Sequence, residues 1–370
     1  MSYVRHLLTG IALLSLFLGG LNLFVDPFDI FGIPHIKGFN TNKSIGIERL
    51  SKPLQATARR PETIILGTSR CMSGVDPRDI DGDRTYNLSV AGALAGEMIM
   101  LARHAAETTP MQRLILCFDF VAFNDTRSVR NGFYSDVLGR YAWLKSLPRT
   151  LFSYSALKRS RNTLRDSLRG KHTAYRSDGF RAFQINPRQT RESILIAPID
   201  AFLSPGGAYR NYPSFREKLA AFGPLIHDLR SQGISVDILI PPVHATMLEA
   251  IGHAGLWQMF EDWKRGIAAF CADASLKCWD FADYNVVTMT ALDQTDGIYS
   301  DVSHFTPEIG RRMLNSIAGL DAEQGFGTPL TPERIKQHLA NIRTARSAYL
   351  RSHADDAEIV RAAAARYGLQ

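Results

Sequence analysis

The chain has 370 residues, with 43 Lys or Arg against 36 Asp or Glu, so its net charge is +7. Hydrophobic residues make up 45% and charged residues 21% of the chain, proportions that exclude a disordered protein or a low-complexity fibre. Four cysteines in this length are too few for a scaffold built from disulfides. The length suits one large α/β domain with an insertion, or two ordinary domains.

The first predicted element is an apolar helix over residues 7–25, which contain no ionised side chain. At a rise of 1.5 Å per residue this run reaches about 28 Å, enough for the hydrocarbon core of a bilayer. Arg5 precedes the run and Asp26 follows it, which predicts a cytoplasmic N-terminus. The run is longer than that of a cleavable signal peptide and lacks a small-x-small site behind it. We expect an uncleaved signal anchor, with the rest of the chain outside the cytoplasm. A buried core helix is the alternative, and the uniformly apolar surface of the run speaks against it.

Residues 26–60 are predicted to form a connector, because they begin with a stretch rich in Pro, Gly and Asn. From residue 61, short apolar strands alternate with helical patterns. Such an order predicts a parallel sheet covered by helices on both faces, in which ligands bind beyond the carboxyl ends of the strands. Strands are expected at residues 63–66, 85–88, 114–118, 236–240 and 277–281, and helices at residues 96–107, 212–230 and 256–270.

A basic segment interrupts the alternation. Residues 145–191 contain 12 Lys or Arg and two Asp, a net charge of +10, so the rest of the chain is slightly acidic. We interpret it as part of a mainly helical insertion at about residues 143–192. Three roles are open to it: a solvated surface, a contact with anionic lipid headgroups, or a rim that holds an acidic glycan. Nucleic acid is not expected as a partner, because no nucleic-acid-binding motif accompanies the charge.

The α/β domain is expected to end near residue 327, and residues 328–370 to form a helical tail. Thr331 is placed to cap the tail's first helix, with Pro332 at its first position. Cys271 and Cys278 are close enough in sequence to pair, but the sequence leaves open whether they do. The chain has no cysteine and histidine spacing typical of a zinc site, so no metal is expected.

Two short motifs carry potential chemistry. The first strand runs into Gly67-Thr68-Ser69, a turn that would expose the Ser69 hydroxyl and leave its backbone N–H free to donate to an oxyanion. An ordinary turn or helix cap fits the same residues. Far downstream, Asp301 precedes His304 by three residues, so its carboxylate can orient the imidazole while the other ring nitrogen accepts a serine proton. A polar surface loop is the alternative there.

Together these motifs resemble the SGNH (GDSL-type) hydrolase and acyltransferase superfamily, over about residues 63–314. The resemblance implies a three-layer, flavodoxin-like parallel sheet and a catalytic triad in which Ser69 is the nucleophile, His304 the base and Asp301 its partner. It also implies an oxyanion hole formed by the N–H groups of Ser69 and Gly92 and the side chain of Asn124. The nearest likeness is to membrane-anchored SGNH-like proteins of the bacterial cell envelope.

The chain departs from the family pattern in places. The family's Gly-Asp-Ser is Gly-Thr-Ser here, and Asp119 at the end of the third strand precedes Asn124 by five residues. Asp119 is therefore an alternative occupant of the oxyanion position, where it would have to be protonated to help. Arg70 is a candidate for binding an anionic substrate or for pairing with an acid. His244, which follows the fourth strand, is a candidate cleft residue or a packed loop histidine.

The expected function is that of an esterase or O-acyltransferase acting without a cofactor on an acylated carbohydrate or a lipid-linked glycan. The expected location is the bacterial inner membrane, crossed once by residues 7–25, with the bulk of the chain periplasmic or extracellular. The alternative is a non-catalytic glycan-binding or scaffold protein of the cell envelope, favoured by Asp119 and by the loose match around Asn124. The acyl donor, the acceptor and the oligomeric state do not follow from the sequence.

Overall fold

The computed structural model describes residues 2–43, 47–124, 126, 128–171, 173–184, 188–320 and 326–369. Parts of the expected connector (44–46), of the basic segment (172 and 185–187) and of the end of the expected α/β domain (321–325) lie outside the described residues.

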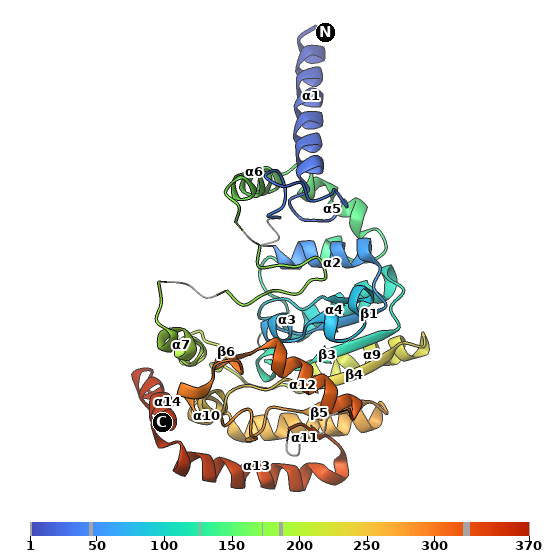
Figure 1. Ribbon diagram of the computed structural model, residues 1–370. Coiled ribbons are helices and arrows are strands. Elements are labelled where there is room, and N and C mark those ends of the chain that lie inside the picture. The colour runs from blue at the N-terminus through green and yellow to red at the C-terminus, as the bar shows by residue number, and fades with distance from the viewer. Residues whose placement is uncertain are drawn as a thin grey trace.

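A six-stranded sheet forms the centre of the molecule, as Figure 1 shows. Its order is β2-β1-β3-β4-β5-β8, and the first five strands are parallel while β8 is antiparallel to β5. The order 2-1-3-4-5 is that of flavodoxin-like doubly wound sheets. The strands are β1 (Thr63–Leu66), β2 (Thr85–Asn87), β3 (Arg113–Cys117), β4 (Ser235–Ile240), β5 (Lys277–Asp280) and β8 (Thr328–Pro329), beside a separate hairpin of β6 (Tyr299–Asp301) and β7 (His304–Phe305).

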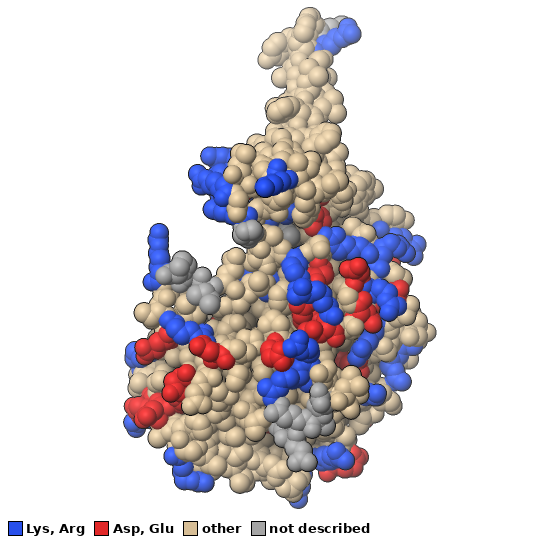
Figure 2. Space-filling model, in the orientation of Figure 1, with Lys and Arg blue, Asp and Glu red and all other residues tan. Residues whose placement is uncertain are grey.

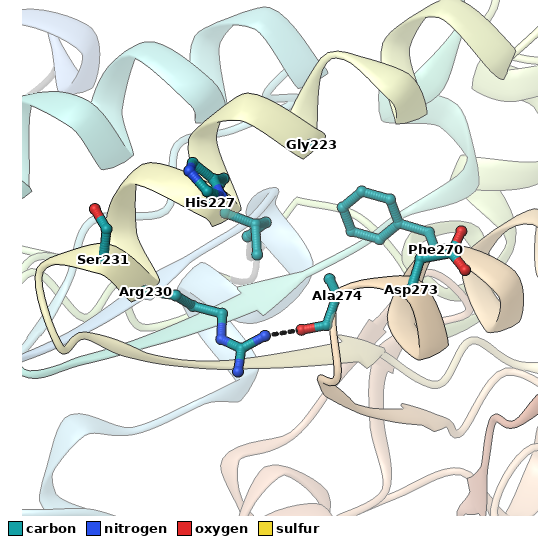
Figure 3. A pocket seen from close by; sticks show the side chains of 8 residues that line it. Gly223, His227, Arg230, Ser231, Phe270, Asp273 and Ala274 are labelled. Atoms are coloured by element: carbon teal, nitrogen blue, oxygen red, sulfur yellow. Dashed lines mark hydrogen bonds between the residues drawn. The ribbon is translucent and has the colours of Figure 1, made fainter.

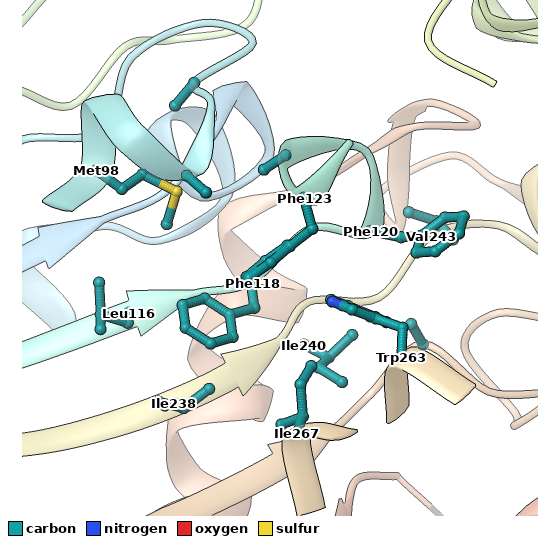
Figure 4. Packing of buried hydrophobic residues seen from close by; sticks show 14 of the residues in the cluster. Met98, Leu116, Phe118, Phe120, Phe123, Ile238, Ile240, Val243, Trp263 and Ile267 are labelled. Carbon is teal, nitrogen blue, oxygen red and sulfur yellow. The ribbon is translucent and has the colours of Figure 1, made fainter. Parts of the chain in front are cut away.

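Helices cover both faces of this sheet because alternate strand residues point to opposite sides. Ile64 and Leu66 belong to a core shared with α4 (Ala95–Thr108), α9 (Phe222–Ser231) and α11 (Trp257–Asp273). Ile65 belongs to a second core shared with α3 (Ser69–Gly74) and α12 (Pro307–Ala318). Figure 4 shows the larger core beyond the end of β3, where the side chains of Phe118, Phe123 and Trp263 pack together. The result is a mixed α/β fold in three layers.

The five strands predicted from the sequence are confirmed, each within about a residue of its expected bounds. The helix predicted over 212–230 is instead two helices, α8 (Arg216–Ala220) and α9. Pro224 lies in the first turn of α9, where it needs no intrahelical N–H partner, but it could not continue a helix from α8. In the tail, Thr331 stands at the N-cap of α13 (Pro332–Ser352), as expected, and α14 (Ala354–Arg366) follows.

The expected connector is partly helical. Helix α2 (Glu48–Arg59) packs against α4, with Leu50 and Leu54 buried in a small core. It therefore belongs to the folded body rather than to a linker. The remaining helices are α5 (Ala142–Thr150), α6 (Tyr154–Leu168), α7 (Arg191–Leu203) and α10 (Ala245–His253), and short 3₁₀ turns cover Pro77–Asp79, Gly82–Arg84, Phe120–Phe123, Ser135–Val137 and Leu292–Gln294.

Helix α1 (Ser2–Val25) projects from the body (Figure 1). Within the described residues it is the one helix long and apolar enough to cross a membrane. Its side chains up to Phe17 are largely exposed, whereas Gly19, Asn22 and Val25 are buried. An exposed apolar helix of this length suits a membrane anchor and does not suit a core helix of a soluble domain.

Both pairs of cysteines are bridged. Cys271 at the end of α11 is bonded to Cys278 in β5, which settles a pairing that the sequence left open. Cys71 in α3 is bonded to Cys117 at the end of β3, with the two Cα atoms 6.5 Å apart. Disulfides are typical of oxidising compartments.

Candidate active site

Ser69 lies at the carboxyl edge of the sheet, on the tight turn between β1 and α3. The turn requires glycine at position 67, because a Cβ atom there would lie 2.6 Å from Cβ of Cys117. Thr68 is the N-cap of α3, and its hydroxyl accepts a hydrogen bond from the backbone N–H of Arg70. Ser69 is the first helical residue, so its own N–H has no partner within the helix.

Ser69, His304 and Asp301 form a continuous hydrogen-bonded chain. Ser69 Oγ is 2.9 Å from His304 Nε2, and His304 Nδ1 is 2.8 and 2.9 Å from the two carboxylate oxygens of Asp301. The Asp301 carboxylate also accepts the backbone N–H groups of Ser303 and His304 at 2.8 and 2.9 Å. These bonds fix the tight β6–β7 turn, so that Nδ1 faces the carboxylate and Nε2 faces the serine. The structure thus brings together the three residues that the sequence nominated.

A pocket of about 330 Å³ opens in front of this chain. It is lined by Ser69, Gly92, Arg130, Phe202, Ser303 and His304, among others. The ring of Phe183, which sequence reasoning did not nominate, lies with its centroid 5.4 Å from that of the His304 imidazole.

Gly92 lines the same pocket, as its expected role requires. Its φ of +56° is a left-handed conformation that favours glycine. A Cβ atom at this position would also lie 2.8 Å from Nη2 of Arg130. The Gly92 carbonyl accepts a hydrogen bond from Arg130 Nε at 2.6 Å, while its N–H has no hydrogen-bond partner in the described part of the chain. That N–H is therefore available to a ligand.

Asn124 is placed differently from the expectation. Its amide Nδ2 donates to the backbone carbonyl of Asn211 at 3.2 Å, and its Oδ1 accepts from Thr126. It lines a neighbouring pocket and is absent from the lining of the pocket around Ser69. The 3₁₀ turn over Phe120–Phe123 separates Asn124 from the end of β3 and carries its side chain away from the sheet edge where Ser69 lies.

Asp119 and Arg70 form a buried ion pair, so Asp119 does not offer an oxyanion site, while Arg70 also lines the pocket around Ser69, as expected of a candidate cleft residue. The Asp119 carboxylate accepts hydrogen bonds from the Thr68 hydroxyl and from Arg70 Nη1. Burial alone would lower the pKa of Arg70, but the charge of Asp119 raises it above its usual value. Arg70 Nε donates to Ser303 Oγ at 3.2 Å. The pair therefore links the turn that carries Ser69 to the turn that carries His304.

His244 is a packed residue and does not line the pocket around Ser69. It is fully buried and caps α10, where its Nδ1 accepts from the backbone N–H of Thr246. Its Nε2 donates to the carbonyl of Thr290 at 2.6 Å. Burial lowers the pKa of its imidazole to about 4, so the neutral form is held at neutral pH.

The Cys71–Cys117 disulfide joins α3, which begins with Ser69, to β3 and was not predicted. Both cysteines are fully buried, two residues after Ser69 and at the end of β3 respectively. A sequence pattern that could have indicated this disulfide is the position of each cysteine near the carboxyl end of a strand. Cys71 follows β1 by five residues and Cys117 ends β3, and these two strands pair directly. A covalent bond between α3 and β3 limits the movement of the serine turn relative to the sheet.

A larger pocket than the one around Ser69 lies elsewhere in the described part of the chain. It has a volume of about 610 Å³ and lies between α9 and α11, lined by His227, Arg230 and Phe270 among others. Figure 3 shows Arg230 bonded to the carbonyl of Ala274 across its floor. Because β4 and β5 begin just after these helices, this pocket lies at the amino edge of the sheet, opposite Ser69. Ligand sites of open α/β sheets lie at the other edge.

The described residues contain no group of three or more His, Cys, Asp or Glu side chains placed to hold a metal ion. Comparison with known proteins adds no assignment, because no protein-family model matches the chain and no curated protein matches its sequence. The sequence motifs and the geometry around Ser69 are therefore the observations that bear on function.

Proposed function

We propose that this chain is an SGNH-like serine esterase or O-acyltransferase, anchored by α1 in the bacterial inner membrane with its α/β body in the periplasm. The observation that carries the proposal is the hydrogen-bonded chain from Ser69 through His304 to Asp301, at the edge of a pocket. The two disulfides support an oxidising compartment for the body.

The proposed reaction begins with attack of Ser69 Oγ on the carbonyl carbon of an ester. His304 Nε2 accepts the hydroxyl proton as the new C–O bond forms, and Asp301 stabilises the resulting imidazolium. The N–H groups of Ser69 and Gly92 donate to the developing oxyanion, a contribution of which each donor is typically worth ~10²–10³ in rate. The C–O bond to the leaving alcohol then breaks, and His304 returns its proton to that oxygen.

The acyl group is then transferred from Ser69 to an acceptor, which regenerates the free enzyme. Water gives an acid and makes the protein an esterase, whereas a sugar hydroxyl gives a new ester and makes it an acyltransferase. In both cases His304 removes the proton of the acceptor and Ser69 recovers its own. The resemblance to envelope proteins favours acetyl as the acyl group and an acylated polysaccharide or a lipid-linked glycan as the substrate class.

A burst experiment tests the proposal. The full chain in detergent is mixed with an aryl acetate, and release of the phenol is followed from the first milliseconds. We expect a burst that is stoichiometric with enzyme and absent in Ser69→Ala, whose circular dichroism should match that of the wild type. Phenol release that is equal in both proteins would contradict the proposal.

The second candidate function is a non-catalytic module that binds glycan or scaffolds an envelope assembly. It is favoured by the position of Asn124, because the proposed oxyanion site then has only two backbone donors. In this case the aryl acetate gives no Ser69-dependent burst, while binding of an acetylated polysaccharide is unchanged by Ser69→Ala.

A further inference from the structure

The end of α1 nearest the body packs against protein on one side, while Leu23 and Phe24 on its other side are exposed. Gly19, Asn22 and Val25 are buried where α1 packs along α6. Asn22 Nδ2 donates to the carbonyl of Leu151 at 2.6 Å, and Ser160 Oγ donates to Asn22 Oδ1 at 2.7 Å. With both ends of its amide bonded, Asn22 fixes the depth of α1 against helices α5 and α6.

This packing sets where the membrane can lie. From Arg5 to Leu18, above the packed end, α1 rises only about 20 Å. The hydrocarbon core of a bilayer is about 30 Å thick, which is the rise from Arg5 to Val25. If Arg5 stays at one surface, the other boundary of the hydrocarbon falls at the level of the packed end of α1. Helices α5 and α6 lie at that level (Figure 1).

The surface of α5 and of the α5–α6 turn suits that depth. Trp143, Leu144 and Phe152 are exposed apolar side chains, and Tyr154 is 81% exposed. Aromatic side chains of this kind gather at membrane–water interfaces, where a ring can contact both acyl chains and headgroups. Exposed to water, the same side chains would form an unexplained apolar patch beside the anchor.

Helix α6 adds positive charge next to these apolar side chains. Its buried side carries small residues such as Ala156 and Ser160, while Lys158, Arg161 and Arg165 follow one another at helical spacing on the exposed side. Figure 2 shows Lys and Arg gathered over α6 at the base of the projecting helix. Basic side chains within reach of a membrane surface are attracted to anionic lipids.

We propose that α5, the turn over 151–153 and α6 form an interfacial platform, defined as residues 142–168, which lies in the outer headgroup layer and binds the phosphates of anionic lipids. The platform packs against the anchor, its exposed apolar side chains from Trp143 to Tyr154 precede the exposed basic ones of α6 along the chain, and α1 is too short to hold it clear of the bilayer. An acidic glycan would meet the same charges but would leave Trp143 and Leu144 without a partner. The proposal does not depend on the chemistry at Ser69.

A depth measurement tests the platform in the full chain. Leu144→Cys or Tyr154→Cys is labelled with an environment-sensitive fluorophore and reconstituted into vesicles of phosphatidylcholine with phosphatidylglycerol. Leu350→Cys on α13, at the far end of the body, is the matched control, because Leu350 is also exposed. We expect headgroup-proximal quenchers on lipid to quench the labels at 144 and 154 several-fold more than the label at 350, with aqueous iodide showing the reverse.

The charge is tested by a second pair of variants. Lys158→Gln with Arg161→Gln should reduce the lipid quenching at position 144 in vesicles containing phosphatidylglycerol, and should change it little in pure phosphatidylcholine. Lys336→Gln with Arg351→Gln, an equal change of charge on α13, should have no effect. Iodide quenching at 144 and 154 equal to that at 350 would overturn the proposal. A second result would also overturn the proposal: the labels respond to a soluble acidic polysaccharide but do not respond to anionic lipid. That is the result expected if the basic side chains form a rim that holds a glycan.

Discussion

Oγ of Ser69 lies 2.9 Å from Nε2 of His304, although 235 residues separate them in the chain. The contact depends on how closely α3, which begins with Ser69, approaches the β6–β7 hairpin and α12. Glycines make the approach possible: Gly74 in α3 contacts the ring of Phe305, and Gly310 in α12 contacts the backbone of Gly74. The site is thus assembled by backbone packing between distant segments as well as by its own hydrogen bonds.

The first prediction concerns this glycine contact. Gly310→Ala should lower both the stability and the activity, because its Cβ would overlap the carbonyl oxygen of Gly74, a backbone atom that cannot move alone. Overpacking of this kind typically costs about 1–3 kcal/mol. Gly223→Ala in α9 is the matched control, since nothing lies within 4 Å of its Cβ position. Urea denaturation and aryl acetate turnover measure both effects. Equal behaviour of the two variants would show that the close approach is not needed.

Asp301 is expected to raise the rate of Ser69-dependent turnover by holding the His304 imidazole in a fixed orientation. In Asp301→Asn the side chain has one acceptor oxygen for what are now three N–H contacts, so the imidazole loses its fixed orientation. In related triads the loss of the carboxylate costs roughly 10⁴ in kcat, and we expect a fall of about 10³–10⁴ in Ser69-dependent turnover. Asp296→Asn, an exposed carboxylate nearby in sequence, should leave kcat unchanged. A comparable loss in both variants would contradict the orienting role.

The Arg70–Asp119 pair yields a prediction on coupling. Asp119→Asn leaves the buried guanidinium uncompensated, a change that typically costs about 3–5 kcal/mol. Replacing both residues, with Arg70→Met and Asp119→Asn, should cost less than the sum of the single changes, because no charge is then stranded. Denaturation of the four proteins completes the cycle. If the losses in unfolding free energy of the two single variants add up to the loss of the double variant, the two side chains do not interact in solution.

His244 yields a prediction on pH. Its folded pKa of about 4 lies below the ordinary value of 6.5, so the unfolded chain binds more protons between these values and stability falls as pH drops through this range. Between pH 7 and pH 5 the loss from this residue is ~2 kcal/mol. His244→Gln should be less stable than the wild type at pH 7, and the difference should narrow towards pH 5. A difference that stays constant with pH would refute the buried neutral imidazole.

Much of the fold could be predicted because its strands are short apolar runs that end at turns. Asp301 and His304 lie within one turn, and Ser69 follows the end of β1 by three residues, so each of the two motifs was visible locally. That the two motifs meet across 235 residues was implied only by the resemblance to the SGNH superfamily.

The parts that escaped prediction depend on long-range packing. Helix α2 buries Leu50 and Leu54, but the polar side chains of Lys52 and Gln55 are buried beside them and Pro53 lies within the helix, so the sequence was not interpreted as helical there. The bond between Arg70 and Ser303 spans 233 residues, and no local pattern signals it. The side chain of Asn124 turns to Asn211, 87 residues further along, so its direction is decided by a loop whose position the sequence does not reveal.

The most direct test of the account is to find the acyl group on Ser69. The full chain is mixed with an aryl acetate, quenched with acid during the burst, digested and analysed by mass spectrometry, beside Ser69→Ala and His304→Gln. We predict one acetyl group on the peptide that contains Ser69 in the wild type, little in His304→Gln and none in Ser69→Ala. An acetyl group on another residue, or equal acetylation of all three proteins, would contradict the assignment of Ser69 as the nucleophile.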